Sequence, residues 1–191
     1  GAMWVGTSRG VAHWDERGIA TFGPRDGLPY PIVYSVDAAQ GMVAVGTAYG
    51  FALKDQGGWR HYRVGHGGLS DDWVNATSIS PEGEVFIGTY DAGVDRLHAG
   101  QAQETQGLES VWVNPNGLLS LKGIPGTLVA TLGDGLWLRQ PDGETCRLDR
   151  RLPLPSVDVT DAVIFGEALW ISTRAGLARW PLNILTGCGE S

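Results

Sequence analysis

Short apolar runs alternate with glycine-bearing polar turns along the whole chain, and the same phrase returns five times. Each run ends in a small residue followed by threonine, as in residues 43–47 and 85–89. The five threonines are Thr7, Thr47, Thr89, Thr131 and Thr173. Their successive intervals of 40, 42, 42 and 42 residues indicate an array of one structural unit.

Each unit has the apolar pattern of four short strands. A second apolar run follows the turn glycine, which predicts a hairpin. Another strand opens at a valine six residues after a Gly-Leu or Arg-Leu pair, and a polar strand such as residues 59–62 closes the unit. The opening valines are Val33, Val74, Val113 and Val157. Four antiparallel strands in about 42 residues are typical of one propeller blade.

We therefore predict an all-β fold, a β-propeller of about five four-stranded antiparallel blades. The units cover about residues 4–32, 33–73, 74–112, 113–156 and 157–187 of one domain. Five hairpins but only four opening valines imply that the first blade lacks its innermost strand, and residues 182–186 are the candidate last strand. Three explanations stay open: part of a larger propeller, a ring with a three-stranded blade, or two chains that complete each other. We expect a self-contained ring of five units.

Composition excludes some classes of function. The net charge is −7 and no basic run occurs, so sequence-independent binding to nucleic acid is not expected. No run of 18 apolar residues is present, so we expect no transmembrane segment. No secretory signal is visible, and residues 1–3 resemble the remnant of a cloning site.

No catalytic constellation or cofactor motif emerges from the residues. Asp71 and Asp72 are adjacent, and adjacent side chains on a strand point to opposite faces, so they do not form an acid–base pair. The glycines follow the blade period rather than a phosphate-binding motif. The histidines, His13, His61, His66 and His98, lack metal-ligand spacing. We expect no catalytic residues, no cofactor and no metal.

The chain has two cysteines, Cys146 and Cys188. Cys146 falls in the last strand of the fourth unit, and Cys188 follows the last strand of the fifth. Adjacent blades could bring them together as a disulfide, or they are two unrelated thiols, and the sequence leaves both open.

The order of these phrases resembles the two-component regulator propeller repeat. Residues 68–74, which read Gly-Leu-Ser-Asp-Asp-Trp-Val, and residues 85–89, which read Val-Phe-Ile-Gly-Thr, are the best matches. The resemblance covers nearly the whole chain and is weaker in the third to fifth units. It implies a periplasmic or extracellular ligand-sensing domain, of the kind that is often joined to a membrane helix and a kinase or cyclase.

In a propeller of this kind the loops before the innermost strands and the turns of the hairpins emerge on one face, around the axis. Aromatic side chains beside carboxylates and arginines suit a small polar ligand, a glycan or a partner protein. The alternative is that these turns are polar because they are hydrated and that the tryptophans cover blade edges. The candidate binding residues are Tyr34, Tyr49, Asp71, Asp72, Trp73, Asn75, Tyr90, Asp91, Trp112, Asn114, Asp134, Asp158 and Arg174.

We therefore expect a non-enzymatic ligand- or protein-binding propeller, similar to extracytoplasmic sensor domains. Two other classes remain in competition. A propeller-fold enzyme, such as a lyase or a glycan-cleaving protein, is compatible with the fold, because sites are grafted onto folds. An assembly module would complete its open blade with a second chain, as a homodimer.

Overall fold

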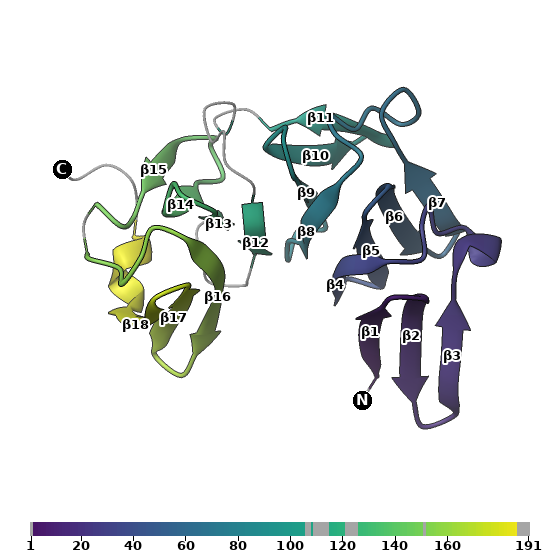
Figure 1. Cartoon of the computed structure of the whole chain (residues 1–191), viewed down its shortest axis with the longest axis horizontal. Helices are drawn as coiled ribbons and strands as arrows, with labels where there is room; N and C mark the ends of the chain where they lie inside the picture. Colours follow the sequence, from purple (N-terminus) through teal and green to yellow (C-terminus); the bar gives the residue numbers. More distant parts are fainter. Residues whose placement is uncertain (1, 106–107, 109–114, 121–125, 151, 187–191) are drawn as a thin grey trace.

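The chain folds into antiparallel sheets that stand side by side along an open arc (Figure 1). The structure, a computed structural model, describes residues 2–105, 108, 115–120, 126–150 and 152–186. In this part of the chain five sheets correspond to the five predicted units, and we call them blades 1 to 5. The predicted all-β propeller fold is therefore confirmed.

Blades 2, 3 and 4 have four strands each, and blades 1 and 5 have three among the described residues. Blade 1 comprises β1 (Met3–Thr7), β2 (Gly10–Asp15) and β3 (Gly18–Phe22). Blade 2 comprises β4 (Val33–Ala39), β5 (Met42–Thr47), β6 (Gly50–Asp55) and β7 (Gly58–Tyr62). Blade 3 comprises β8 (Val74–Ile79), β9 (Val85–Thr89), β10 (Val94–His98) and β11 (Gln101–Glu104). Blade 4 comprises β12 (Pro115–Leu119), β13 (Thr127–Thr131), β14 (Leu136–Arg139) and β15 (Thr145–Arg147), and blade 5 comprises β16 (Val159–Phe165), β17 (Ala168–Thr173) and β18 (Gly176–Pro181).

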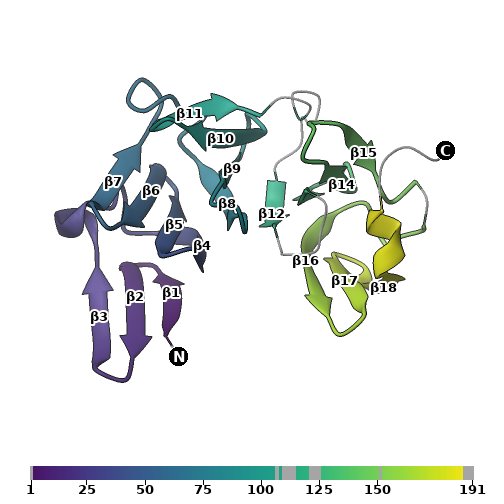
Figure 2. The ribbon, with the colours of Figure 1, turned by 180° about the vertical axis from the view of Figure 1, so that it is seen from behind.

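The first strand of each blade lies on the concave side of the arc, in chain order. β1 packs on β4, β4 on β8, β8 on β12 and β12 on β16. No comparable packing joins β16 to β1 within the described residues, and both views show blades 1 and 5 at opposite ends (Figure 2). The expectation of a self-contained ring was therefore wrong for this part of the chain, which forms an open arc.

At the two ends of the arc, one prediction is confirmed and another is wrong. Blade 1 begins with the strand equivalent to β5, so the absence of its innermost strand is confirmed for the described residues. Its first strand starts at Met3, which pairs with Trp14, and Met3 therefore belongs to the propeller. The predicted last strand is instead a 3₁₀ helix, η2 (Leu182–Leu185), because Leu182 and Leu185 lie three residues apart and both pack on the core of blades 4 and 5.

The repeated threonine closes the turn of every hairpin. Its Oγ1 donates a hydrogen bond of 2.7–3.0 Å to the carbonyl oxygen of the turn glycine, which opens the next strand or directly precedes it. The same Oγ1 accepts a hydrogen bond from a backbone N–H inside the turn in each case. A side chain with one donor and free lone pairs is needed to do both, which explains why threonine recurs.

A bulge recurs near the start of each complete innermost strand. In β4, Val33 pairs with Thr47 and Ser35 with Gly46, so Tyr34 is the extra residue. The corresponding extra residues of β8, β12 and β16 are Asn75, Asn116 and Thr160. In blade 5 the strand thus opens at Val159, two residues after the predicted Val157. Val113, the valine predicted to open the strand of blade 4, lies outside the described residues. Val157 lies before β16, where its carbonyl oxygen accepts a hydrogen bond from the Gly135 N–H.

Apolar clusters between neighbouring blades form the core. One cluster joins blades 2 and 3, and another joins blades 4 and 5. Small residues before the repeated threonine permit this close packing, since a Cβ at Gly46 would meet both Ser35 and Val74. Polar groups also join blades: the half-buried Asp37 carboxylate accepts a hydrogen bond of 2.7 Å from the Ile79 N–H.

The helical segments in the described residues are short. Besides η2, a 3₁₀ helix, η1 (Pro24–Asp26), lies between β3 and β4. Neither helix has the length and apolarity that crossing a membrane requires.

Candidate binding surface

Backbone hydrogen bonds tie the hairpin turns to the loops that precede the innermost strands. The Gly50 N–H donates to the Asp72 carbonyl, and the Tyr90 N–H donates to the Trp73 carbonyl, at 2.6 and 2.7 Å. In blade 5 the Arg174 N–H donates to the Asp158 carbonyl at 3.0 Å. The two classes of loop therefore share one face of the arc, as the sequence predicts, and this face is fixed by main-chain bonds.

Three aromatic side chains form a row on this face. The Trp73 ring stacks on Tyr90, with 4.8 Å between the ring centroids and 20° between the planes. The Tyr34 ring also lies near Trp73, with 6.0 Å between the ring centroids and 30° between the planes. The residues remain exposed to solvent: Tyr34 by 50%, Trp73 by 41% and Tyr90 by 44%. We call these three residues the aromatic row.

Local structure explains why these rings meet. Tyr34 is the bulge residue of β4, and a bulge turns its side chain away from the regular alternation of the strand. The bond from the Tyr90 N–H to the Trp73 carbonyl holds the stacked pair together. Asp71 adds a clamp, since its carboxylate accepts hydrogen bonds from the N–H groups of Trp73 and Asp91, at 3.2 and 3.1 Å. The row is thus positioned before any ligand arrives.

The loop before Trp73 is also anchored from below by a buried carboxylate. Asp95 accepts hydrogen bonds from the Ser70 N–H and the Ser70 hydroxyl, at 2.9 and 2.7 Å. Burial raises the pKa of Asp95 above its ordinary value, and the two Ser70 bonds oppose this by lowering the pKa. The side chain therefore supports the binding surface from the interior and does not reach it.

A second aromatic group lies on the blade 2 side. Tyr49 packs against Tyr30, with ring centroids 6.3 Å apart, and the Arg63 guanidinium lies 3.6 Å above the Tyr49 ring centroid. Arg63 also lies 3.9 Å from the carboxylate of Asp72, which accepts a hydrogen bond from the Val64 N–H. Asp72 thus holds the chain after β7 in place. Arg63 was missed at the sequence level because it follows an outer strand.

The remaining predicted residues lie apart from the aromatic row or stay untested. Asp134 pairs with Arg147, whose bond to Asp149 is the main cause of its raised pKa. Asp158 precedes β16, and Thr160 rather than Asp158 occupies the bulge position equivalent to Tyr34. Asn75 takes the bulge position of β8. Trp112, Asn114 and Cys188 lie outside the described residues, so the pairing of Cys188 with Cys146 stays a prediction.

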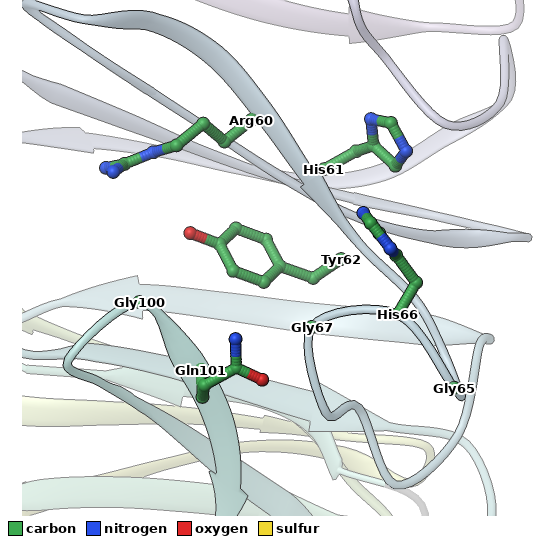
Figure 3. A pocket seen from close by; sticks show the side chains of 8 residues that line it. All are labelled: Arg60, His61, Tyr62, Gly65, His66, Gly67, Gly100 and Gln101. Carbon is green, nitrogen blue, oxygen red and sulfur yellow. The ribbon is translucent and has the colours of Figure 1, made fainter.

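A polar hollow of about 490 Å³ opens at the outer rim, between β7 and the turn from β10 to β11. Figure 3 shows the imidazole rings of His61 and His66 close together, while Tyr62 points to the other side of the strand. Their ring centroids are 5.4 Å apart because a tight turn brings His66 back to Arg63, with backbone bonds in both directions. In the described part of the chain no group of three or more His, Cys, Asp or Glu side chains is placed to hold a metal ion.

Comparisons with solved structures agree with the propeller fold. No protein-family model matches the chain, and no curated protein matches it. The extracellular domain of BT4673 from B. thetaiotaomicron, described both as a one-component and as a hybrid two-component system, matches with a TM-score of 0.73 and 20% identity, over 99% of this chain and 28% of that chain. PorZ of Porphyromonas gingivalis, a surface component of the type-IX secretion system, matches with a TM-score of 0.71 and 16% identity, over 95% of this chain and 30% of that chain.

A third similar structure is virginiamycin B lyase from Staphylococcus aureus, with a TM-score of 0.66 and 15% identity, over 95% of this chain and 66% of that chain. The chain therefore spans less than a third of BT4673 and PorZ and about two thirds of the lyase. Identities this low establish the fold that is shared. Extracellular domains of signalling systems among these structures agree with the resemblance to regulator propellers.

Proposed function

We propose that the chain is a non-enzymatic binding domain that recognises a polar ligand or a partner protein through the aromatic row. The observation that carries this proposal is the exposure of Tyr34, Trp73 and Tyr90 side by side on a face fixed by main-chain bonds. Exposed aromatic rings that a rigid scaffold holds in contact are typical of binding surfaces, because they bury apolar area at little cost in side-chain entropy.

The row favours ligands with both an apolar face and polar edges. The exposed rings of Tyr34 and Tyr90 offer apolar contact, and the carboxylate of the exposed Asp91, next to Tyr90 in the chain, can accept hydrogen bonds. A saccharide ring or a peptide carrying a planar side chain has this combination. Extracellular domains among the similar structures support a place outside the cytoplasm, as part of a sensor.

The carboxylates of this face support binding rather than catalysis. Asp71 accepts two backbone hydrogen bonds, and Asp72 accepts one from Val64 and lies beside Arg63. Both groups are therefore engaged in holding loops. The likeness to a lyase rests on the fold, and sites are grafted onto folds, so it does not favour an enzyme for this chain.

A thermal-shift screen with a panel of oligosaccharides and aromatic peptides tests the proposal. We expect at least one class of probe to raise the unfolding temperature, and Trp73→Ala to abolish the shift. Trp14→Ala is the matched control, since Trp14 is also an exposed tryptophan but belongs to β2, in the blade at one end of the arc. If the probe still raises the unfolding temperature of both Trp73→Ala and Tyr34→Ala, the binding site lies elsewhere. Asp72→Ala is unsuitable because it releases the chain at Val64.

A further inference from the structure

One position of the repeat is buried in four blades and exposed in the fifth. The first residue after the turn glycine faces the following blade, and in blades 1 to 4 it is 0–1% exposed. These residues are Val11, Phe51, Val94 and Leu136. In blade 5 the same position is Leu177, which is 67% exposed. Leu177 thus has the character of an interface residue but has no blade against it in the described residues.

The rest of this side of blade 5 mixes apolar and polar residues. We call it the forward face: it carries Leu177, Trp170, Val163 and Phe165, which is 76% exposed at the end of β16. Asp161, Ser172 and Arg179 lie on the same side of the sheet. A hollow of about 80 Å³ on this face is lined in part by Val163, Trp170 and Leu177. Exposed apolar side chains beside a hollow are suited to receive side chains from another sheet.

The opposite end of the arc carries the complementary side. The rear face of blade 1 exposes Met3, Val5, Trp14 and Ile19. Met3 pairs with Trp14 and Trp14 with Ile19 across β1, β2 and β3, and Val5 lies two residues along β1 from Met3. The positions of Met3 and Val5 correspond to Val43 and Val45 in blade 2 and to Leu169 and Ile171 in blade 5, all of which are buried against the preceding blade. The rear face of blade 1 therefore carries residues of the kind that form interfaces between blades, but no blade among the described residues covers them.

Interfaces inside the arc show how the two faces fit. Between blades 4 and 5, the forward positions of one blade and the rear positions of the next form one buried cluster, which includes Leu128, Leu136, Leu138, Leu169, Ile171 and Trp180. The same chain thus presents, at its two ends, the two halves of an interface that it already uses between neighbouring blades.

We propose that the forward face of blade 5 binds the rear face of blade 1 in a second copy of this chain. Trp14 of the second copy would take on blade 5 the place that Trp180 takes on blade 4. The contact is heterologous, because two different faces meet, and such contacts form either closed rings or open chains of copies. This inference is independent of the proposed ligand-binding function.

The curvature of the arc decides between these outcomes. The chain covers 66% of a lyase propeller with which it shares its fold, so the turn of the arc corresponds to a ring with roughly two more blades. A second copy brings five blades rather than two, and the pair cannot close. We therefore expect open head-to-tail association that grows with concentration, rather than a discrete dimer.

Sedimentation velocity on the full chain and on variants blocked at one end tests this proposal. Leu177→Asp blocks the forward face, and Trp14→Lys blocks the rear face; both residues are exposed, so neither change disturbs the core. The wild-type chain should show a sedimentation coefficient that rises with concentration. Each variant alone should remain monomeric, because it retains only one functional face. An equimolar mixture of the two variants should form a species of twice the monomer mass.

Controls make each outcome decisive. Val64→Asp places the same charge on an exposed apolar residue outside both faces and should associate like the wild type. Circular dichroism checks that all variants are folded. The proposal is overturned if the wild type is monomeric at every concentration or if the mixture of the two variants stays monomeric. It is also overturned if each variant alone still associates, which is the result expected if copies pair through the open edge of β1.

Discussion

Trp14 and Trp180 occupy the same position of the repeat, four residues after Gly10 and Gly176, yet Trp14 is 57% exposed and Trp180 only 4%. Trp14 pairs with Met3 and Trp180 with Leu169, so each points toward the preceding blade. Blade 4 covers Trp180, and no described residue covers Trp14 in the same way. Burial in this fold is thus decided by the neighbouring blade rather than by the residue or its strand.

This pair gives a direct test of the role of neighbouring blades in stability. Trp180→Ala should lower the free energy of unfolding by about 3–5 kcal/mol, because it empties a filled core position. Trp14→Ala should change it by about 0.5 kcal/mol or less, as an exposed site does. Urea unfolding of dilute, monomeric samples measures both. Equal effects of the two substitutions would contradict this account of the arc.

The turn threonines should contribute through hydrogen bonds rather than through shape. In Thr131→Val the hydroxyl that donates to the Gly135 carbonyl and accepts from the Asp134 N–H is replaced by a methyl group. We expect a loss of about 1–2 kcal/mol in the free energy of unfolding, since both hydrogen bonds are lost and the Asp134 N–H loses its acceptor in the turn. Urea unfolding measures this loss.

Thr77→Val is the matched control for the turn threonines. The Thr77 hydroxyl is buried and has no hydrogen-bond partner among the described residues, so its removal should be neutral or slightly stabilising. If Thr77→Val costs as much as Thr131→Val, packing of the β-branched side chain explains the repeat and the hydrogen bonds do not.

Asp95 should make stability depend on pH. Burial raises its pKa in the folded chain above the ordinary value of 3.8. Over the interval between 3.8 and the raised pKa, the folded chain keeps a proton that the unfolded chain has released, so the free energy of unfolding falls as pH rises. Its contribution is fully present below pH 3.8 and lost above the raised pKa.

Asp95→Asn should remove this part of the pH dependence, because the amide has a similar shape but does not titrate. Urea unfolding at a series of pH values, from below 3.8 to neutral, compares the slopes of the two proteins. The control is Asp142→Asn, at an exposed turn carboxylate that accepts a bond from the Glu144 N–H. If the free energy of unfolding changes with pH in the same way in the wild type and in Asp95→Asn, Asp95 is not the source of this pH dependence.

Most of the fold could be predicted because each repeat carries the same short pattern of apolar residues, threonine and turn glycine. The threonine spacing located every hairpin, and the small residue at Gly46 was correctly explained by close packing, since a Cβ there would lie 2.4 Å from the Ser35 hydroxyl and 2.7 Å from Val74. The offset of two residues in blade 5 arose because Val157 was taken as the start of the strand. The structure begins this strand at Val159.

The candidate site was predictable only in part. Loop positions follow from topology, so Trp73 and Tyr90 were expected on one face, and backbone bonds place them there. Which side chains meet depends on bulges and tight turns that leave no clear trace in the sequence. Arg63 is the best example, because its contact with Tyr49 requires the turn that returns the chain from Arg63 to His66.

The claim that the aromatic row is the binding surface is tested most directly by the indole N–H signals of the eight tryptophans in a ¹⁵N-labelled sample. Trp73→Phe identifies the Trp73 signal, and Trp14→Phe identifies that of Trp14. During titration with a probe from the thermal-shift screen, we predict that the Trp73 signal moves in proportion to occupancy while the Trp14 signal stays in place. A bound probe that leaves the Trp73 signal unmoved, or that shifts only tryptophans at the ends of the arc, would contradict the account.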